Sequence, residues 1–274
     1  MIKKIKDFIL RNQNGLNGKS EHKKVNLEWW AVEVNLGDAI SPIIVDWVLN
    51  KKGINRNGII SKTTHLMAVG SLLGMRRFDA TVWGSGVLSL GMVMRVNSQS
   101  RYRKYDVRAV RGPLTQQVIK FAGYSCPDIF GDPAILMPDI YVSVCKEKRY
   151  KVSIVSHHEF KIPQSMETLC NIIDIKTKDY MGFIDSLNMS EKVVSSSLHG
   201  IILAEAYGIP AIFLGTGMES QYIKFYDWYY STGRYSVKVA KTIEEALVME
   251  PMPLPELEQM RKNILAAFPY DLWE

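Results

Sequence analysis

The feature that most constrains this chain is a repeated alternation of short apolar runs with segments of helical pattern. The apolar runs at residues 80–83 and 211–214 have the length of buried strands. The segments at 113–122 and 199–207 have helical spacing, and each is followed directly by a glycine. A strand, a helix and a further strand in succession build parallel sheets that carry helices on both faces. The sequence therefore predicts an α/β fold.

The alternation is interrupted around residues 138–150, where Pro, Asp, Lys and Arg are mixed. A chain of 274 residues has room for roughly two domains of ordinary size. We expect an N-terminal domain over residues 1–140 and a C-terminal domain over 150–274, which includes the last helix. Both are expected to be Rossmann-like, with mostly parallel sheets facing a central cleft. Ligands of such sheets bind where strands end, so the loops after strands are the places to look for chemistry.

Charge and cysteine content limit the partners. The net charge of +6 favours anionic partners, which include phosphorylated substrates, anionic membranes and nucleic acids. The chain carries no recognised RNA-binding motif, so we expect no nucleic acid partner. The cysteines, Cys126, Cys145 and Cys170, are widely spaced. This spacing argues against a zinc site or a disulfide framework and fits a reducing, cytoplasmic location.

The first residues have the pattern of a short basic amphipathic helix. Ile2, Ile5 and Ile9 lie at helical spacing, with three lysines between them. Such a helix could lie peripherally on the inner face of an anionic membrane. The alternative, which we favour, is a short helix packed on its own domain or a frayed end.

The loop at residues 195–200 is the strongest candidate for chemistry. A buried strand runs into Ser195, Ser196 and Ser197, and then into His199 and Gly200 at the start of a helix. Helix N-termini bind anions through free backbone N–H groups, and serine hydroxyls add donors. His199 stands where it can donate a proton to a bound anion or to its neighbour. Simple capping of the helix explains one serine, but not this whole set.

A second candidate is Arg111, which follows a strand and directly precedes Gly112 and Pro113 at a helix start. Arginine holds phosphate or carboxylate by two parallel hydrogen bonds. An arginine that bonds only to its own loop is an equal alternative on this pattern alone.

Two turns after strands complete the set of candidates. Asn35, Gly37 and Asp38 favour a tight turn with exposed backbone amides, which could touch a ligand or serve only as a turn. Gly84 and Ser85 belong to a second turn that lacks the third glycine of a dinucleotide-binding motif.

At these residues the sequence resembles the polysaccharide pyruvyl transferase family. The matching segments are Asn35-Leu36-Gly37-Asp38, Trp83-Gly84-Ser85-Gly86, Val107-Arg108-Ala109-Val110-Arg111-Gly112, Gly131-Asp132-Pro133, Ser195-Ser196-Ser197-Leu198-His199-Gly200 and Lys224-Phe225-Tyr226-Asp227-Trp228. They occur in the family's order across roughly residues 27 to 240. The chain departs from the usual family pattern at Val34 and Ser85, where the family often has glycine.

The resemblance implies two Rossmann-like domains similar to GT-B glycosyltransferases. It implies transfer of a pyruvyl unit from phosphoenolpyruvate to two hydroxyls of a sugar, which forms a cyclic ketal and releases phosphate. The acceptor is expected to be a glycan of a bacterial capsule or exopolysaccharide, or a lipid-linked oligosaccharide precursor. No metal and no separate cofactor are expected.

In this scheme His199 is the expected general acid. The substrate-binding residues are expected to be Arg111, Ser195, Ser196, Ser197, Gly200, Asn35, Gly37, Asp38, Gly84 and Ser85. The donor is expected at the helix start of the C-terminal domain, and the acceptor on the N-terminal domain with Arg111.

Two other functions remain open on the sequence. A GT-B glycosyltransferase that uses a nucleotide sugar would need the same architecture and the same phosphate-binding helix. A non-catalytic polysaccharide-assembly protein would keep the fold with a degenerate site, although the presence of both Arg111 and His199 argues against degeneracy.

Overall fold

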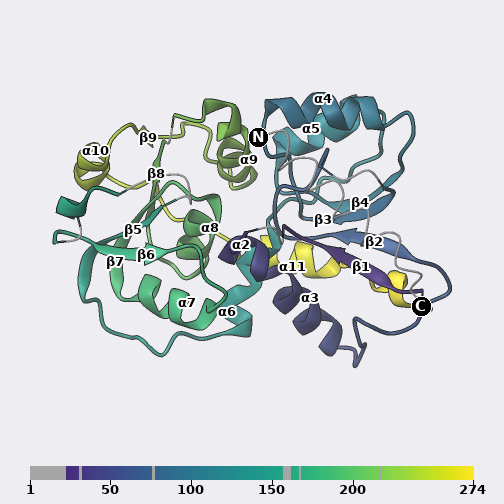
Figure 1. Cartoon of the computed structure of the whole chain (residues 1–274), viewed down its shortest axis with the longest axis horizontal. Coiled ribbons are helices and arrows are strands. Elements are labelled where there is room, and N and C mark those ends of the chain that lie inside the picture. Colours follow the sequence, from purple (N-terminus) through teal and green to yellow (C-terminus); the bar gives the residue numbers. More distant parts are fainter. Residues whose placement is uncertain (1–22, 31–32, 76–77, 157–161, 167, 216) are drawn as a thin grey trace.

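The computed structural model of the chain describes residues 23–30, 33–75, 78–156, 162–166, 168–215 and 217–274. The amphipathic pattern of Ile2, Ile5 and Ile9 lies outside these residues. Within them the strands form two separate sheets, one in each half of the chain (Figure 1). Every pairing in both sheets is parallel, which confirms the predicted α/β fold. The closer likeness to GT-B enzymes stays a prediction.

The first sheet has the strand order β1-β2-β3-β4, so each strand pairs with the next one in the sequence. Its strands are β1 (Val25–Glu28), β2 (Thr64–Met67), β3 (Ala80–Trp83) and β4 (Tyr105–Ala109). The second sheet has the order β6-β5-β7-β8-β9. Its strands are β5 (Tyr150–Ser156), β6 (Asn171–Asp174), β7 (Ser190–Ser195), β8 (Ala211–Leu214) and β9 (Val239–Ala240).

Helices connect the strands in both halves. The α-helices are α2 (Leu36–Ala39), α3 (Ser41–Asn50), α4 (Leu90–Gln99), α5 (Pro113–Phe121), α6 (Met137–Ile140), α7 (Tyr180–Asn188), α8 (Leu198–Ala206), α9 (Tyr222–Ser231), α10 (Ile243–Val248) and α11 (Glu258–Ala266). The 3-10 turns are η1 (Pro133–Leu136), η2 (Gln164–Met166), η3 (Glu219–Gln221) and η4 (Tyr270–Trp273).

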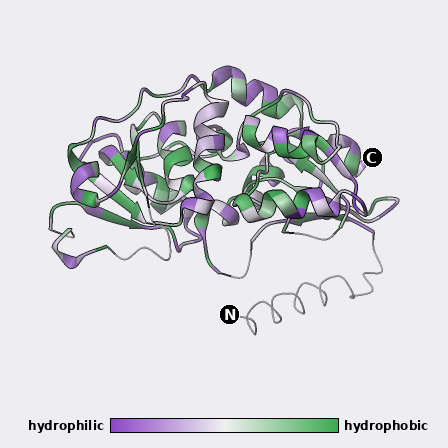
Figure 2. Ribbon diagram, turned by 90° about the horizontal axis from the view of Figure 1, so that it is seen from above, coloured by the Kyte–Doolittle hydropathy of each residue, from purple (hydrophilic) through white to green (hydrophobic). Residues whose placement is uncertain are grey.

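Apolar side chains hold the helices on the sheets. Strands β3 and β8 are buried along their whole length, as expected for strands covered on both faces. Helix α8 is also buried at every residue, so it is a core helix that lies between the sheet of its own half and the other half. Figure 2 shows hydrophobic colour along the strands of both halves, with hydrophilic colour on outer helices and loops.

The C-terminal helix α11 lies against the first half of the molecule, below β1 in Figure 1. The indole N–H of Trp83 donates to the carbonyl of Ile264 at 2.8 Å. Arg261 donates from Nε to the carbonyl of Ile135 and from Nη2 to that of Ala206. Helix α11, expected as part of the C-terminal domain, therefore ties η1 of the first half to α8 of the second. The division at residues 140–150 itself stays a prediction.

Helix α4 was not apparent from the sequence. Its Gly91, Asn97 and Ser98 favour helices poorly, and only Val96 in it is buried. Among the described residues, the structure contains no helix with the length and apolarity that a membrane span requires.

Candidate active site

A pocket of about 320 Å³ lies where the two halves meet. Its residues from the first half follow strands β1 to β3, and those from the second half belong to the start of α8 and to η3 and α9. They are Trp30, Glu33, Val34, Asn35, Asp38, Ser71, Leu72, Met75 and Leu88 on one side, and Ser197, Leu198, His199, Gln221 and Lys224 on the other. The pocket therefore lies at the carboxyl ends of the strands, where ligands of parallel sheets usually bind.

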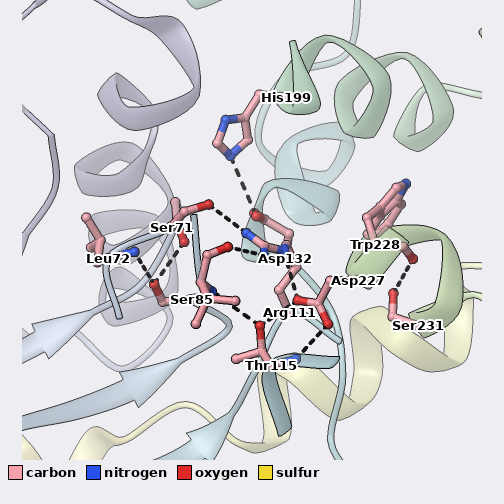
Figure 3. A network of polar contacts seen from close by, with 12 residues as sticks. Ser71, Leu72, Ser85, Arg111, Thr115, Asp132, His199, Asp227, Trp228 and Ser231 are labelled. Atoms are coloured by element: carbon pink, nitrogen blue, oxygen red, sulfur yellow. Dashed lines mark hydrogen bonds and ion pairs between the residues drawn. The ribbon is translucent and has the colours of Figure 1, made fainter. Parts of the chain in front are cut away.

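His199 and Asp132 face each other beside this pocket (Figure 3). Nε2 of His199 lies 3.6 Å from Oδ2 of Asp132, within ion-pair distance but longer than a hydrogen bond. Both atoms are buried, and neither has a hydrogen-bond partner among the described residues. Buried polar atoms are nearly always bonded, so an unsatisfied pair beside a pocket marks a place where chemistry is to be expected.

The two carboxyl oxygens of Asp132 have different contacts. Oδ1 accepts a hydrogen bond of 3.0 Å from the backbone of Ala134 and so caps η1. This bond fixes the carboxyl group and leaves Oδ2 directed at His199. The side chain has no exposed surface, so Asp132 orients the imidazole from behind and does not itself line the pocket.

The turn at residues 35–38 supports His199 from the other half of the molecule. Asn35 caps α2 by accepting a 3.0 Å hydrogen bond from the backbone of Gly37. The backbone N–H of Leu36 donates to the carbonyl of Ile175 in the second half at 2.9 Å. A β-carbon on Gly37 would overlap the imidazole ring of His199, so the absence of a side chain there lets the ring pack against the turn.

Asp38 lies in the pocket wall next to this contact. The pKa of its carboxyl is raised from 3.8 to about 6, chiefly by burial and in smaller part by the negative charge of Asp132. Electrostatic interactions with His199 and Lys224 and a hydrogen bond from the Trp30 backbone lower this pKa. Protein atoms surround most of the carboxyl group, but it keeps some contact with the pocket. Such a group can give or take a proton near neutral pH.

The serines before α8 have different roles. Oγ of Ser195 is buried, donates to the carbonyl of Val155 at 2.9 Å and accepts from the backbone N–H of Ser197 at 3.0 Å, so it holds the shape of the loop. Ser196 is also buried. Ser197 lines the pocket, and its hydroxyl does not cap the helix. Gly200 packs against Ser195, whose hydroxyl a β-carbon would meet. Of the three predicted serines, Ser197 alone lines the pocket.

Lys224 completes the cationic side of the pocket. Lys224 is buried, with 7% of its surface exposed, and its Nζ donates to Oε1 of Gln221 at 3.1 Å. Together with His199 and the start of α8, it offers a ligand a concentrated set of N–H donors and positive charge. The pocket is thus cationic on the side of the second half and carries Asp38 and Glu33 on the side of the first.

Arg111 does not line the pocket, although the sequence predicts that it contacts substrate. Its side chain has no exposed surface, and every nitrogen of the guanidinium group is engaged. Nε donates to Asp227 at 3.1 Å, Nη1 to Ser71 at 2.7 Å and Nη2 to the Val87 carbonyl at 2.8 Å (Figure 3). Because Ser71 lines the pocket, Arg111 positions the pocket wall from behind.

The anion at Arg111 is the protein's own Asp227 on α9. Besides Arg111, this carboxylate accepts from the backbone N–H of Thr115 at 2.9 Å and from its hydroxyl at 2.6 Å. Thr115 lies in the first turn of α5, whose N-cap, Gly112, has no side chain to offer. The anion at this helix start is therefore a side chain of the protein itself.

Gly84 and Ser85 also lie outside the pocket and act on its shape. Gly84 has a φ of 83°, and a β-carbon there would clash with Pro133, so this turn requires glycine. Ser85 is buried, donates to the carbonyl of Gly70 at 2.8 Å and accepts from the backbone of Leu72 at 3.2 Å. It therefore fixes the loop that brings Ser71 and Leu72 to the pocket.

Asp132 and Lys224 are the important site residues that the residue patterns alone did not single out. Asp132 lies in a segment with the pattern of a structural turn, and its Oδ1 does stabilise that turn. No sequence pattern indicates that its Oδ2 faces His199. Lys224 lies in α9, a helix rich in aromatic residues, and such a pattern ordinarily indicates a helix face packed in the core. No cluster of three or more His, Cys, Asp or Glu side chains suited to a metal occurs in the described part of the chain.

Comparisons with known proteins identify a family and several relatives. The family model described as polysaccharide pyruvyl transferase matches residues 65–217, which is more than half of the chain. The uncharacterized protein L143 of Acanthamoeba polyphaga mimivirus is 28% identical over 227 residues, which cover 77% of this chain and 75% of that protein. The succinoglycan biosynthesis protein ExoV of Rhizobium meliloti is 29% identical over 185 residues, covering 66% of this chain and 51% of ExoV.

A solved structure shares the fold. The crystal structure of a functionally uncharacterized protein from Klebsiella pneumoniae aligns with a TM-score of 0.53 and 15% identity, covering 85% of this chain and 98% of that one. Because the family model covers more than half of the sequence, the chain belongs to the polysaccharide pyruvyl transferase family.

Proposed function

We propose that this chain transfers a pyruvyl unit from phosphoenolpyruvate to two hydroxyls of one sugar in a surface polysaccharide or its lipid-linked precursor. The product is a cyclic pyruvate ketal, and phosphate is released. The observation that carries this proposal is the pocket between the two halves, where a buried His–Asp pair stands beside a cationic helix start.

The donor is expected on the side of the second half. Phosphoenolpyruvate carries a phosphate and a carboxylate, and Lys224, Ser197 and the free end of α8 offer donors for both. A pocket of about 320 Å³ is at the small end of ligand sites, which favours this compact donor over a nucleotide sugar.

The acceptor is expected on the side of the first half. Trp30 offers an aromatic surface for a sugar ring, while Asn35 and Glu33 can bond to its hydroxyls. In this proposal the acceptor hydroxyls lie between the donor and the first sheet, close to His199 and Asp38.

His199 is the proposed general acid. Protonation of the methylene carbon of phosphoenolpyruvate makes the neighbouring carbon electrophilic, so that a sugar hydroxyl can attack it. Phosphate then leaves, and the second hydroxyl closes the ketal. The Asp132 carboxylate stabilises the positive charge that His199 carries as an acid and holds its ring in place. Lys224 offsets the charge of the departing phosphate.

Calorimetric titration of phosphoenolpyruvate into the protein, beside a panel of nucleotide sugars, tests the proposal. We expect saturable binding of phosphoenolpyruvate, at least tenfold weaker in Lys224→Gln, because a charge-assisted contact is worth roughly 1.5–3 kcal/mol. Lys262→Gln, which removes an exposed lysine of α11 outside the pocket, serves as the matched control.

The other outcomes discriminate between the alternatives. Binding of a nucleotide sugar without phosphoenolpyruvate would identify a glycosyltransferase. Binding of a glycan with no response to any donor would point to a non-catalytic polysaccharide-assembly protein.

A further inference from the structure

The proposed reaction needs more proton transfers than His199 alone performs. One proton must reach the methylene carbon of the donor, and one must leave each of the two attacking hydroxyls. The phosphate that departs must also gain a proton to become hydrogen phosphate. A second group that both accepts and donates protons is therefore required in the pocket.

Asp38 has the position for this task. It lines the same pocket as His199, and it follows Gly37, against which the His199 ring packs. Its Oδ1 lies against Gly70, where a β-carbon would come within 2.9 Å of it. The missing side chain at Gly70 leaves room for the carboxyl group at the pocket wall.

The other carboxyl groups of the site are less suited. Asp132 is fully buried behind His199, and one of its oxygens is committed to capping η1. Glu33 is exposed to solvent at the pocket rim, whereas Asp38 is partly enclosed by protein atoms.

We propose that Asp38 is the second acid–base group of the reaction, an inference that rests on the proposed function. Its carboxylate accepts the proton of the first hydroxyl as that oxygen bonds to the central carbon, while His199 protonates the methylene carbon. Asp38 then gives this proton to the phosphate oxygen as the carbon–oxygen bond to phosphate breaks. His199 takes the proton of the second hydroxyl as the ring closes, so both groups return to their starting states.

The surroundings of Asp38 favour transfer in both directions. The groups that act on it are His199 of α8, Lys224 of α9 and Asp132 before η1, and the effect of burial on its pKa exceeds the opposing effects of His199 and Lys224. The resulting pKa of about 6 lies close to neutral pH. At that value the carboxylate is available as a base, and its acid form still gives up a proton readily.

Asp38→Asn tests the assignment, because the amide keeps the shape and cannot accept the proton. With phosphoenolpyruvate and a panel of free and lipid-linked sugar acceptors, we expect turnover to fall about 10²–10⁴-fold. Calorimetric binding of phosphoenolpyruvate should be retained. Asp46→Asn, which removes a carboxylate of α3 outside the pocket, should leave turnover unchanged. Asp38→Ser provides a second variant, and thermal melting verifies that both are folded.

The pH profile supplies a readout that a structural role would not affect. In the wild type, kcat/KM should fall below about pH 6, as Asp38 becomes protonated. This acidic limb should be absent from the residual activity of Asp38→Asn. Wild-type turnover in Asp38→Asn, an unchanged acidic limb, or loss of phosphoenolpyruvate binding together with activity would overturn the inference. If the wild type consumes no phosphoenolpyruvate with any acceptor, the proposed function fails as well.

Discussion

Helices α5 and α8 begin in similar ways and differ in what their N-termini face. Each follows a strand of a parallel sheet, and in neither does the N-cap residue, Gly112 or Ser197, supply a capping side chain. At α5 the carboxylate of Asp227 bonds to the helix start and to Arg111. At α8 the helix start opens onto the pocket, beside the unsatisfied pair of His199 and Asp132.

The difference separates a fully hydrogen-bonded structural ion pair from the pair to which we assign the proposed proton transfer. Arg111 and Asp227 are both fully buried and satisfied by hydrogen bonds, so together they join α9 to the first half without offering a binding site. Nε2 of His199 and Oδ2 of Asp132 lie 3.6 Å apart, and neither atom has a hydrogen-bond partner among the described residues. A helix N-terminus without a capping side chain favours an anion, and the fold decides whether the protein's own carboxylate takes that position or leaves it open to a pocket.

The largest expected effect is on the reactive pair. Asp132→Asn should retain the cap on Ala134 through its remaining oxygen, but its amide group should face Nε2 of His199 in place of a carboxylate. We expect turnover to fall about 10²–10³-fold, because the orientation and charge of the general acid are lost. Steady-state kinetics with phosphoenolpyruvate measures this effect.

Asp179→Asn is the control for Asp132→Asn, since Asp179 caps α7 in the same manner outside the pocket. Equal turnover in the wild type and Asp132→Asn would show that the His199–Asp132 pair is no more involved in the reaction than the Arg111–Asp227 pair.

The structural pair should affect stability instead. Arg111→Ala leaves Asp227 buried without its cation, and we expect the free energy of unfolding to fall by about 3–5 kcal/mol. Urea denaturation measures the loss. Arg108→Ala is the control, because Arg108 also bonds two carboxylates but is partly exposed, and it should cost no more than about 1 kcal/mol. If Arg111→Ala stayed stable and lost affinity for phosphoenolpyruvate, Arg111 would be a ligand residue after all.

The smallest expected effect is the pH dependence of stability at Asp38. Its pKa is about 6 in the folded chain and 3.8 as a free group, so the folded state binds the proton more tightly. The contribution of Asp38 to the free energy of unfolding therefore decreases as the pH rises from about 4 to 6.

Asp38→Asn removes this cost of ionisation. At pH 7 the variant should be more stable than the wild type by about 1–3 kcal/mol, and the difference should vanish at pH 4. Urea denaturation at the two pH values measures it. A variant less stable than the wild type at pH 7 would show that the carboxylate serves the fold rather than the site.

Much of the fold is predictable because local patterns carry it. Strands β3 and β8 are short apolar runs, and α5 and α8 each have a glycine or proline at the start or just beyond the end. Helix α4 lacks such marks, since its Gly91 and Asn97 give little helical preference and packing decides its structure.

The site is predictable only in part, because its essential contacts join residues far apart in the sequence. The position of His199 at a helix start is visible locally. Its partner, Asp132, comes from the other half of the molecule and uses a carboxylate oxygen that its turn does not need. The burial of Arg111 likewise depends on Asp227, which no local pattern connects to it.

Reaction with isotopically labelled phosphoenolpyruvate tests the central claim most directly. The protein would be incubated with donor labelled at its central carbon and with the panel of free and lipid-linked sugar acceptors. Nuclear magnetic resonance would then follow the label, while a phosphate assay follows the leaving group. The account predicts a ketal carbon on the sugar, formed in equal amount to the phosphate released, and neither product with His199→Gln. Phosphate release without a ketal, or a ketal formed at the wild-type rate by His199→Gln, would contradict it.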